Sequence, residues 1–179
     1  VIELTDAYRA LDHMAAFNVE LQRFLDKRIR AFLGRDLSYA FYDVTNYFFH
    51  IDCPDDPGEL RRKGVSKEHR VDPIVQMGLF IDNKGLPISM SLFPGNTSDC
   101  LTLKPILMKL KKAYELERLM VVADKGLNSS SNLDFICQNG DGFVFSQILR
   151  GKKGQRYHAA LFDEEGYVWN TDHSSKYKL

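Results

Sequence analysis

Two aspartates occupy comparable places in two apolar stretches of the sequence. Asp124 follows the apolar residues 119–123 and precedes Gly126, which permits a sharp turn. Asp43 lies within residues 37–49, which are rich in the aromatic and β-branched side chains that favour strands. We therefore expect two buried strands that each carry a carboxylate into the interior, where a charge needs a partner or a cation. Carboxylates at such strand positions predict a divalent metal site.

Each aspartate also has a simpler explanation. Asp124 could be an acidic turn residue that caps the next helix, although Ser129 or Ser130 could equally cap it. Asp43 could be satisfied by a hydroxyl such as that of Thr45, or by backbone donors. The metal interpretation is stronger for the pair of aspartates than for either one alone.

The composition is that of an ordinary folded domain. The 179 residues are 44% hydrophobic and 27% charged, which suffices for one domain with a core. Basic and acidic residues number 24 each, so any nucleic-acid binding would depend on local patches. Cys53, Cys100 and Cys137 are widely spaced and odd in number. This pattern argues against a disulfide scaffold or a zinc ribbon and predicts a reducing, cytoplasmic setting.

The two ends of the sequence suggest a piece of a longer protein. The chain begins with Val-Ile-Glu-Leu, without an initiator methionine or a signal-like leader, and ends with Lys-Tyr-Lys-Leu. No run approaches the roughly 18 apolar residues of a membrane helix. We therefore expect a fragment that does not associate with a membrane.

Periodicity predicts helices first and a mixed sheet afterwards. Residues 5–34 have helical spacing and form one long helix or two shorter ones, and the strand with Asp43 follows. A hairpin turn at residues 82–85 joins the next two strands. The remaining expected elements are strands at residues 74–81, 86–93 and 142–149 and helices at residues 101–114 and 130–138. Three antiparallel strands followed by helix, strand, helix and strand is the order of the α/β fold called ribonuclease H-like. Beyond residue 150, the runs 157–162 and 167–170 predict an added β hairpin.

A long connection after the first strand carries several basic residues. It runs from Cys53 to about Pro73, and its acids nearly balance its bases. Connections of this length are often functional, although a solvated surface loop is the plain alternative. Asn96, in a later loop, could support the site or contact DNA, while Thr97, Ser98 or Asp99 could cap the following helix. The candidate contacts to DNA are Arg61, Arg62, Lys63, Lys67, His69, Arg70 and Asn96.

Five motifs stand in order along roughly residues 39–150. They are Tyr42-Asp-Val-Thr-Asn46, Lys63-Gly-Val-Ser-Lys-Glu-His-Arg-Val-Asp72, Gly85-Leu-Pro-Ile88, Phe93-Pro-Gly-Asn-Thr-Ser-Asp99 and Val122-Ala-Asp-Lys-Gly126. Together they resemble the DDE transposases of bacterial insertion sequences, particularly the IS-four-like group. The resemblance implies an N-terminal helical segment at residues 1–36, a ribonuclease H-like catalytic core at 37–150 and the start of a β-rich insertion at 151–179.

The resemblance also implies a chemistry. Asp43 and Asp124 would be the first two of three acids that bind Mg²⁺ or Mn²⁺, with two ions in the complete enzyme. The implied activity is metal-dependent DNA cleavage and strand transfer during transposition, a form of DNA recombination. The implied partners are double-stranded DNA, at transposon ends and target, and a second copy of the full-length chain on that DNA.

The third acid is the point at which this sequence departs from the family. In the family it is a glutamate on a helix beyond the insertion, within a Tyr, Arg, Glu, Lys signature, and residues 151–179 contain no such pattern. Glu164 and Glu165 lie in the expected hairpin turn and are poor substitutes. The resemblance therefore implies a chain that stops before the catalytic helix and is inactive by itself.

Two rival functions stay open at this point. Asp43-Val-Thr45 resembles part of the start of a haloacid dehalogenase-type phosphatase, although Thr45 stands where that family has a second acid. A wholly parallel sheet would favour the phosphatase. The other rival is an inactive remnant of a transposase that binds DNA or assists assembly.

Overall fold

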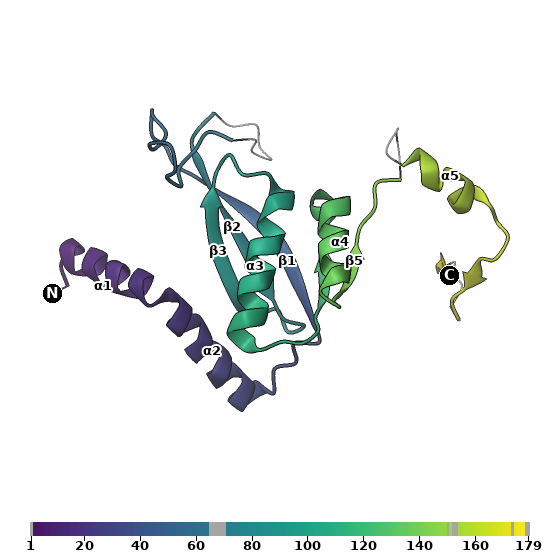
Figure 1. Ribbon diagram of the computed structural model, residues 1–179, viewed down its shortest axis with the longest axis horizontal. Coiled ribbons are helices and arrows are strands. Elements are labelled where there is room, and N and C mark those ends of the chain that lie inside the picture. The colour runs from purple at the N-terminus through teal and green to yellow at the C-terminus, as the bar shows by residue number, and fades with distance from the viewer. Residues whose placement is uncertain (1, 65–70, 150, 152–153, 173, 178–179) are drawn as a thin grey trace. The chain divides into compact units, whose positions relative to one another are not determined.

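The computed structural model describes residues 2–64, 71–149, 151, 154–172 and 174–177 (Figure 1). Contacts divide the chain into two compact units, Val1–Ser146 and Gln147–Leu179. The first unit contains both aspartates of interest, and each unit is described by itself.

The elements of the first unit follow the predicted order. Its described helices are α1 (Leu4–Ala16), α2 (Asn18–Leu33), α3 (Asp99–Tyr114) and α4 (Ser130–Gln138). Its described strands are β1 (Tyr39–Phe48), β2 (Ile74–Ile81), β3 (Pro87–Pro94), β4 (Met120–Ala123) and β5 (Gly142–Phe145), with the short 3-10 turn η1 (Lys125–Leu127) after β4. The expected strand at residues 142–149 is shorter than predicted, because β5 ends at Phe145.

The five strands form one mixed sheet in the order β3-β2-β1-β4-β5. Strands β1, β2 and β3 pair antiparallel, whereas β4 is parallel to β1 and β5 is parallel to β4. Helices α3 and α4 supply the crossovers that parallel pairing requires. The chain has the ribonuclease H-like fold that its order of elements predicts.

The hydrophobic core lies between one face of this sheet and helix α3, which Figure 1 shows in front of the strands. Leu103, Ile106, Leu107 and Leu110 recur at helical spacing on α3 and are all buried. Alternate residues of β1 point toward them, because successive side chains of a strand face opposite sides. The sheet therefore has one face that is covered by helices and an opposite face, called the open face below, that carries the other side chains of each strand.

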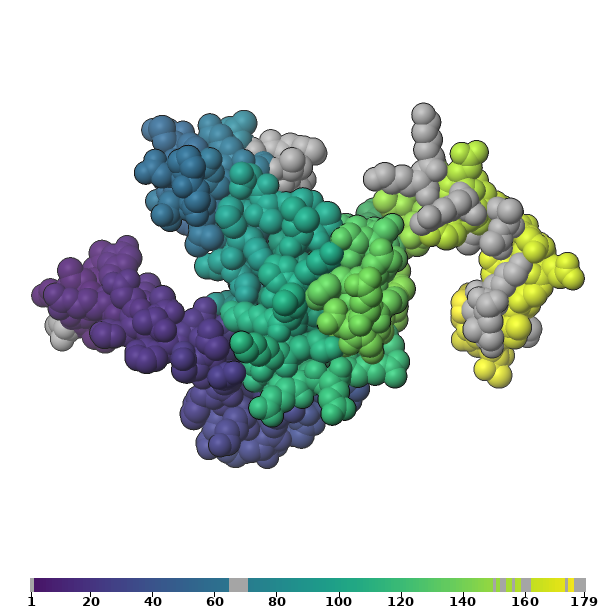
Figure 2. All heavy atoms as spheres, in the orientation of Figure 1, coloured from purple at the N-terminus to yellow at the C-terminus, as the bar shows by residue number. Residues whose placement is uncertain are grey.

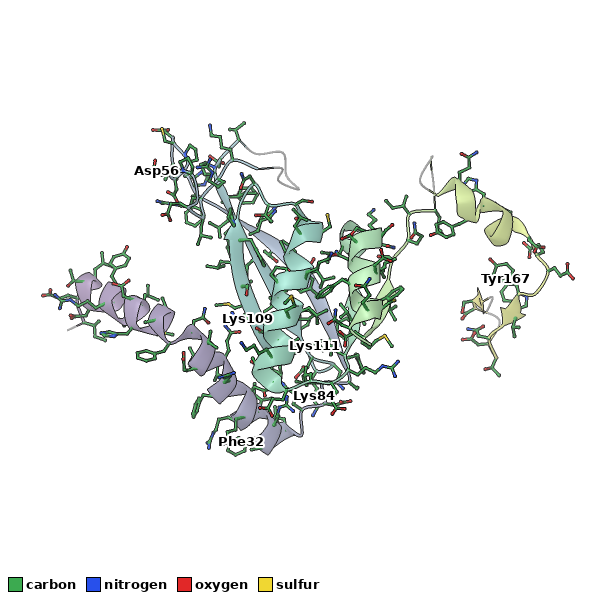
Figure 3. The ribbon with its side chains drawn as sticks, viewed as in Figure 1. Phe32, Asp56, Lys84, Lys109, Lys111 and Tyr167 are labelled. Atoms are coloured by element: carbon green, nitrogen blue, oxygen red, sulfur yellow. The ribbon has the colours of Figure 1, made fainter. Side chains whose placement is uncertain are left out.

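A buried arginine ties α2 to the far end of the β2–β3 hairpin. The Arg35 guanidinium donates to Asp26 on α2 and to Asp82 at the turn, each at 2.8 Å, and to the Pro87 carbonyl at 2.8 Å. Lys84, labelled in Figure 3, donates from the same turn to the Leu33 carbonyl at 2.5 Å. Helix α2 is therefore held by charge-assisted hydrogen bonds as well as by packing.

The second unit differs from the predicted hairpin. Residues 157–162, expected as a strand, lie in helix α5 (Gln155–Phe162), and the short strands β6 (Val168–Trp169) and β7 (Lys176–Tyr177) pair antiparallel after it. Tyr167, labelled in Figure 3, precedes β6. Ala159 and Ala160 have high helix propensity, and that preference prevails over the weak alternation that suggested a strand.

Among the described residues, no helix combines the length and the apolar character that a membrane span requires.

Candidate metal-binding site

The site lies where β1 and β4 run side by side. Their parallel register pairs Phe41 with Val122 and Tyr42 with Ala123. Asp43 and Asp124 are the next residues after this last pair. Neighbouring strands are spaced by about 4.8 Å, which brings the two aspartates together at the carboxyl end of β4. The structure places Asp43 on β1 and Asp124 directly after the neighbouring strand β4, close to the predicted arrangement on adjacent strands. A metal ion shared between them stays a prediction.

Asp43 is exposed, which corrects the expectation that it is buried. Tyr42 and Val44 point into the core, and Phe41, Asp43 and Thr45 point to the opposite, open face of the sheet. The prediction was wrong because β1 carries aromatic residues on both faces, so its composition is that of a strand buried on both sides. The carboxylate therefore needs no cation to offset burial, and its position on an open face makes it accessible to a ligand.

Asp124 is also exposed and has a defined local role. It is the N-cap residue of η1, where its Oδ1 accepts a hydrogen bond from the Gly126 amide at 2.8 Å. The following long helix, α4, is capped instead by Ser129, whose side chain accepts from the Asn132 amide. The turn-capping explanation of Asp124 is therefore correct for η1, and the hydrogen bond fixes the orientation of the carboxylate without using its second oxygen.

The strand β4 is not buried on both faces, contrary to expectation. Val121 is fully buried against the core, whereas Val122 is half-buried and lines a pocket on the open face. The pocket has a volume of about 390 Å³, and Asp43, Asp124 and Thr45 line it together with apolar residues. Its lining residues are Phe41, Tyr42, Asp43, Thr45, Leu79, Ile81, Val122, Ala123 and Asp124.

Thr45 and Phe41 are pocket residues that the search for acids did not single out as site residues. Both lie two positions from Asp43 on β1, one on either side, so strand alternation alone places them on the same face. The alternation of side chains along a strand could therefore have identified both residues from the sequence. Thr45 adds a hydroxyl and Phe41 an exposed ring beside the carboxylates.

The donor set fits a hard divalent cation in part. Two carboxylates can hold Mg²⁺ or Mn²⁺ while leaving positions for water and for a substrate phosphate, as Mg²⁺ sites usually do. In the part of the chain that the structure describes, no group of three His, Cys, Asp or Glu side chains comes together. Glu164 and Glu165 belong to the second unit, between α5 and β6.

Tyr42 supports the site from the covered face. Its hydroxyl donates to Thr102 Oγ1 of α3 at 2.8 Å, and Gly78 on β2 leaves room for it, since a Cβ there would lie 2.2 Å from the Tyr42 oxygen. Burial raises the pKa of Tyr42, and the nearby Asp99 and Asp43 carboxylates raise it further. The Tyr42 hydroxyl therefore stays protonated and anchors β1 rather than acting as a base.

The connection between residues 53 and 73 is called the basic loop below. In its described part, two arginines form hydrogen bonds within the loop. Arg61 pairs with Asp55, with Nε to Oδ1 at 2.8 Å and Nη2 to Oδ1 at 2.7 Å, and this pairing lowers the pKa of Asp55. Arg62 donates to the Asp55 carbonyl. Lys63 is exposed, and so is Asn96. The candidates Lys67, His69 and Arg70 lie outside the described residues.

Two glycines fix this loop against the end of the sheet. The Gly95 amide donates to the Leu60 carbonyl at 3.0 Å, and Arg62 forms a β-bridge with Ile74. A Cβ on Gly64 would lie 1.9 Å from the Gly95 oxygen, and one on Gly95 would lie 2.0 Å from the Ile74 oxygen. Backbone contact at this distance requires glycine, which explains the glycine of the Phe93-Pro-Gly95 segment.

The loop that begins at Pro94 leads into α3. Ser98 is the N-cap residue, one of the three that the sequence offered, although its side chain makes no capping hydrogen bond, and α3 begins at Asp99, two residues before the expected start. Asp99 accepts a hydrogen bond from the side-chain amide of Gln76 at 3.2 Å. Asp99 therefore joins α3 to β2 behind the open face.

No protein-family model matches the chain, and neither does any curated protein. Several solved transposase structures are similar to it. The catalytic domain of Mos1 mariner transposase is 15% identical, with a TM-score of 0.39 over 70% of this chain and 55% of that chain. The Mos1 transposase paired-end complex with left transposon end is 18% identical, with a TM-score of 0.41 over 70% of this chain and 39% of that chain. The mariner Mos1 paired-end complex with Mg is 20% identical, with a TM-score of 0.41 over 73% of this chain and 40% of that chain.

The chain thus spans between 39% and 55% of the length of these three proteins. Similarity at this level is partial and does not assign the chain to a family. The fold assignment rests on the strand order and pairing of the sheet.

Proposed function

We propose that this chain is part of a DDE-type transposase, a polynucleotidyl transferase that cuts and joins DNA with divalent metal ions. The observation that carries the proposal is the placement of Asp43 on β1 and of Asp124 directly after the parallel neighbour β4, in one open pocket of a ribonuclease H-like sheet. The sequence motifs around both residues favour the insertion-sequence transposases of the IS-four-like group.

The two aspartates would bind the metal in this proposal. A divalent cation held there would supply positive charge to stabilise the charge that develops on the phosphorus and on the leaving oxygen. Asp124 is already oriented by the Gly126 amide, and Asp43 is fixed by its place within β1. Thr45 could donate a hydrogen bond to a phosphate oxygen from the same face. These residues would bind and orient the scissile group at the open face of the sheet.

The third acid of the complete enzyme lies, in this proposal, outside the present sequence. The described residues offer no third carboxylate to the pair. A second ion would then lack its protein ligand in this chain, and the pocket would hold one ion weakly. We propose Mg²⁺ or Mn²⁺ as the physiological ion because both accept all-oxygen ligand sets.

Double-stranded DNA is the proposed partner, with transposon ends and target as the two substrates. Lys63 is exposed on a loop whose backbone is fixed by Gly64 and Gly95, a suitable arrangement for a phosphate contact. Arg61 and Arg62 would contribute indirectly, because their hydrogen bonds hold the loop.

Of the two rivals, the phosphatase is disfavoured by the sheet. That alternative depended on a wholly parallel sheet, and β1, β2 and β3 pair antiparallel. An inactive DNA-binding remnant stays as the second candidate, because an open pocket with two of three acids is also what a decayed site would leave.

Metal binding tests the proposed site directly. We expect the 179-residue chain to bind Mn²⁺ weakly in a titration followed by electron paramagnetic resonance, and both Asp43→Asn and Asp124→Asn to reduce that binding strongly. The matched control is Asp134→Asn, which changes an exposed aspartate on α4. Equal Mn²⁺ binding by the wild type, both site variants and the control would show that the pair is not a metal site.

A further inference from the structure

One asparagine is buried where α4 packs against α3. Asn132 is 1% exposed, and Ile136, one turn later on the same side of α4, is fully buried. Figures 1 and 2 show α4 beside α3, and Lys104 of α3 donates to Ser131 Oγ of α4 at 2.6 Å. Because the inward side of a helix is normally apolar, a buried amide at this position indicates a specific role.

The side-chain amide of Asn132 joins two elements that precede α4. Its Nδ2 donates to the Leu127 carbonyl, at the end of η1, at 2.9 Å. It also donates to the Cys100 carbonyl, in the first turn of α3, at 3.0 Å. Both N–H groups of the amide are therefore used, each on a different element. Asn132 connects the turn that follows β4 to the helix that packs on the sheet.

Only the nitrogen of this amide is satisfied. Among the described residues, the buried Oδ1 of Asn132 has no hydrogen-bond partner. A buried acceptor without a partner lowers the stability of a fold. The contribution of Asn132 therefore consists of the two hydrogen bonds that its Nδ2 donates.

The turn η1 depends on contacts from outside it. Its backbone hydrogen bond from the Leu127 amide to the Asp124 carbonyl is 3.3 Å long, beyond the usual length of about 2.9–3.0 Å. The Asp124 carboxylate accepts from the Gly126 amide within the same turn. The hydrogen bond from Asn132 therefore holds the end of a loosely bonded turn, and this turn orients Asp124.

The first turn of α3 also holds the strand that carries the other aspartate. Thr102 Oγ1 accepts from the Tyr42 hydroxyl at 2.8 Å, and Tyr42 precedes Asp43 on β1. The Cys100 carbonyl, two residues before Thr102, accepts from Asn132. One turn of α3 is therefore joined to β1 and, through Asn132, to η1.

We propose that Asn132 is a positioning residue for the candidate metal site. Its amide fixes η1 on the first turn of α3, and this contact sets where the Asp124 carboxylate lies relative to Asp43. Asn132 does not line the pocket of the two aspartates and acts through the turn that Asp124 caps. The inference rests on the proposed function, because the site that it serves is the proposed metal site.

Two substitutions of Asn132 separate positioning from stability. Asn132→Ala removes both hydrogen bonds and leaves a space, whereas Asn132→Leu removes them, fills a similar volume and has no unpaired oxygen. The matched control is Tyr114→Phe, which removes the 2.8 Å hydrogen bond to the Ile88 carbonyl at the opposite end of α3. Circular dichroism and thermal unfolding check the fold of all three variants.

The first measurement follows the turn itself and needs no metal. Hydrogen exchange of the Gly126 amide with water, measured by NMR in the 179-residue chain, reports on the bond that orients Asp124. We expect exchange about fivefold faster in both Asn132 variants, the change that the loss of one ordinary hydrogen bond produces, and unchanged exchange in Tyr114→Phe. Unchanged exchange in folded Asn132 variants would overturn the proposal.

The second measurement is the affinity for Mn²⁺, followed by electron paramagnetic resonance. We expect the dissociation constant to rise about tenfold to a hundredfold in both Asn132 variants, as for residues that orient metal ligands, and to stay at the wild-type value in Tyr114→Phe. Wild-type Mn²⁺ affinity despite faster Gly126 exchange would overturn the proposal, because Asn132 would then serve the turn alone.

Two further outcomes have distinct meanings. Loss of folding in both Asn132 variants would show that the residue supports the fold as a whole, which would also overturn the proposal. A wild-type chain that binds no Mn²⁺ would instead refute the proposed metal site, and Gly126 exchange would still decide whether Asn132 holds Asp124 in place.

Discussion

At the scale of single residues, the acids of this protein fall into two groups. The buried carboxylates Asp26, Asp82 and Asp141 each pair with a base at 2.6–2.8 Å. In the described part of the chain, no ion pair joins Asp43 or Asp124 to a base, although both share one pocket. Capping of η1 accounts for Asp124, whereas no hydrogen bond among the described residues accounts for Asp43, and two neighbouring carboxylates without a cation repel each other.

Asp82 provides a prediction about acid stability. Burial raises the pKa of its carboxyl, but hydrogen bonds from the Leu86 and Lys84 amides and from Arg35 more than offset this, and the net pKa is lowered. A lowered native pKa stabilises the fold above the unfolded pKa of about 3.9, and this contribution is lost as the pH falls through the native value. Asp82→Asn should therefore cost about 3 kcal/mol at pH 7, as for a broken buried pair, and less in acid.

Urea denaturation at neutral pH and in acid checks this expectation. Asp134→Asn, an exposed aspartate on α4, should change the free energy of unfolding by less than about 0.5 kcal/mol at neutral pH. A difference between the wild type and Asp82→Asn that is the same at both pH values would show that Asp82 is not the titrating group.

Gly95 provides a second prediction. An alanine Cβ there would lie 2.0 Å from the Ile74 oxygen and 2.5 Å from the Arg62 oxygen, so backbone must move. We expect Gly95→Ala to lower the free energy of unfolding by about 1–3 kcal/mol or more. Gly140→Ala isolates backbone strain, because φ is +72° there and nothing lies within 4 Å of the added carbon; it should cost about 1 kcal/mol. Thermal unfolding measures the loss of stability in both variants. An equal loss would mean that the backbone around Gly95 moves to accommodate the added carbon at little cost.

The sequence correctly predicted that Asp43 and Asp124 lie near each other, and it wrongly predicted that they are buried. Asp43 and Asp124 could be selected because each interrupts or ends an apolar stretch. Their exposure could not be predicted, because the apolar residues Phe41, Leu79 and Val122 on the open face have the same composition as a buried core. Only the arrangement of the helices shows which face of the sheet is covered.

At the scale of elements, the basic loop shows how charge in a sequence can mislead. Arg61 and Arg62 resemble Lys63 as candidate DNA contacts, yet hydrogen bonds to Asp55 occupy both arginines. The pairing depends on the local turn, which brings residues 55 and 61 together and is not visible in a count of bases.

If the proposed function is correct, the loop predicts different outcomes for two alanine substitutions in the full-length protein. Lys63→Ala should weaken DNA binding evenly across sequences and reduce the slope of log K against log salt by roughly one contact. Arg61→Ala should leave that slope nearly unchanged but increase proteolysis of the loop, because Asp55 loses its partner. Fluorescence anisotropy at several salt concentrations measures the slope, and an equal loss of slope for the two variants would assign Arg61 a direct contact.

Helix α5 is the element whose type was predicted wrongly, as a strand. The core elements were predictable because strands β1 to β3 and helices α3 and α4 have clear periodicities, with glycine, asparagine and serine at their ends. Residues 155–162 have no comparable pattern, and their helix follows from propensity.

At the scale of the whole molecule, the order of elements determined the fold. The short turn between β2 and β3 allows only antiparallel pairing, and helices α3 and α4 supply the long crossovers that the parallel pairing of β4 with β1 and of β5 with β4 requires. The place of Asp43 beside Asp124 follows from this topology, because β4 enters the sheet next to β1.

The last prediction concerns the activity of the chain as a whole. If the two aspartates are two of three ligands, the 179-residue chain should fold and bind Mn²⁺ yet cleave transposon-end DNA far more slowly than the full-length gene product. Losing one electrostatic element at the reacting centre costs about a hundredfold to a thousandfold in rate, and losing a whole metal ion should cost more. The assay compares this chain, the full-length protein and full-length Asp124→Ala with Mg²⁺ or Mn²⁺. Rapid cleavage by the 179-residue chain would mean that an acid within it completes the site. An inactive full-length protein that still binds transposon ends would favour the decayed remnant.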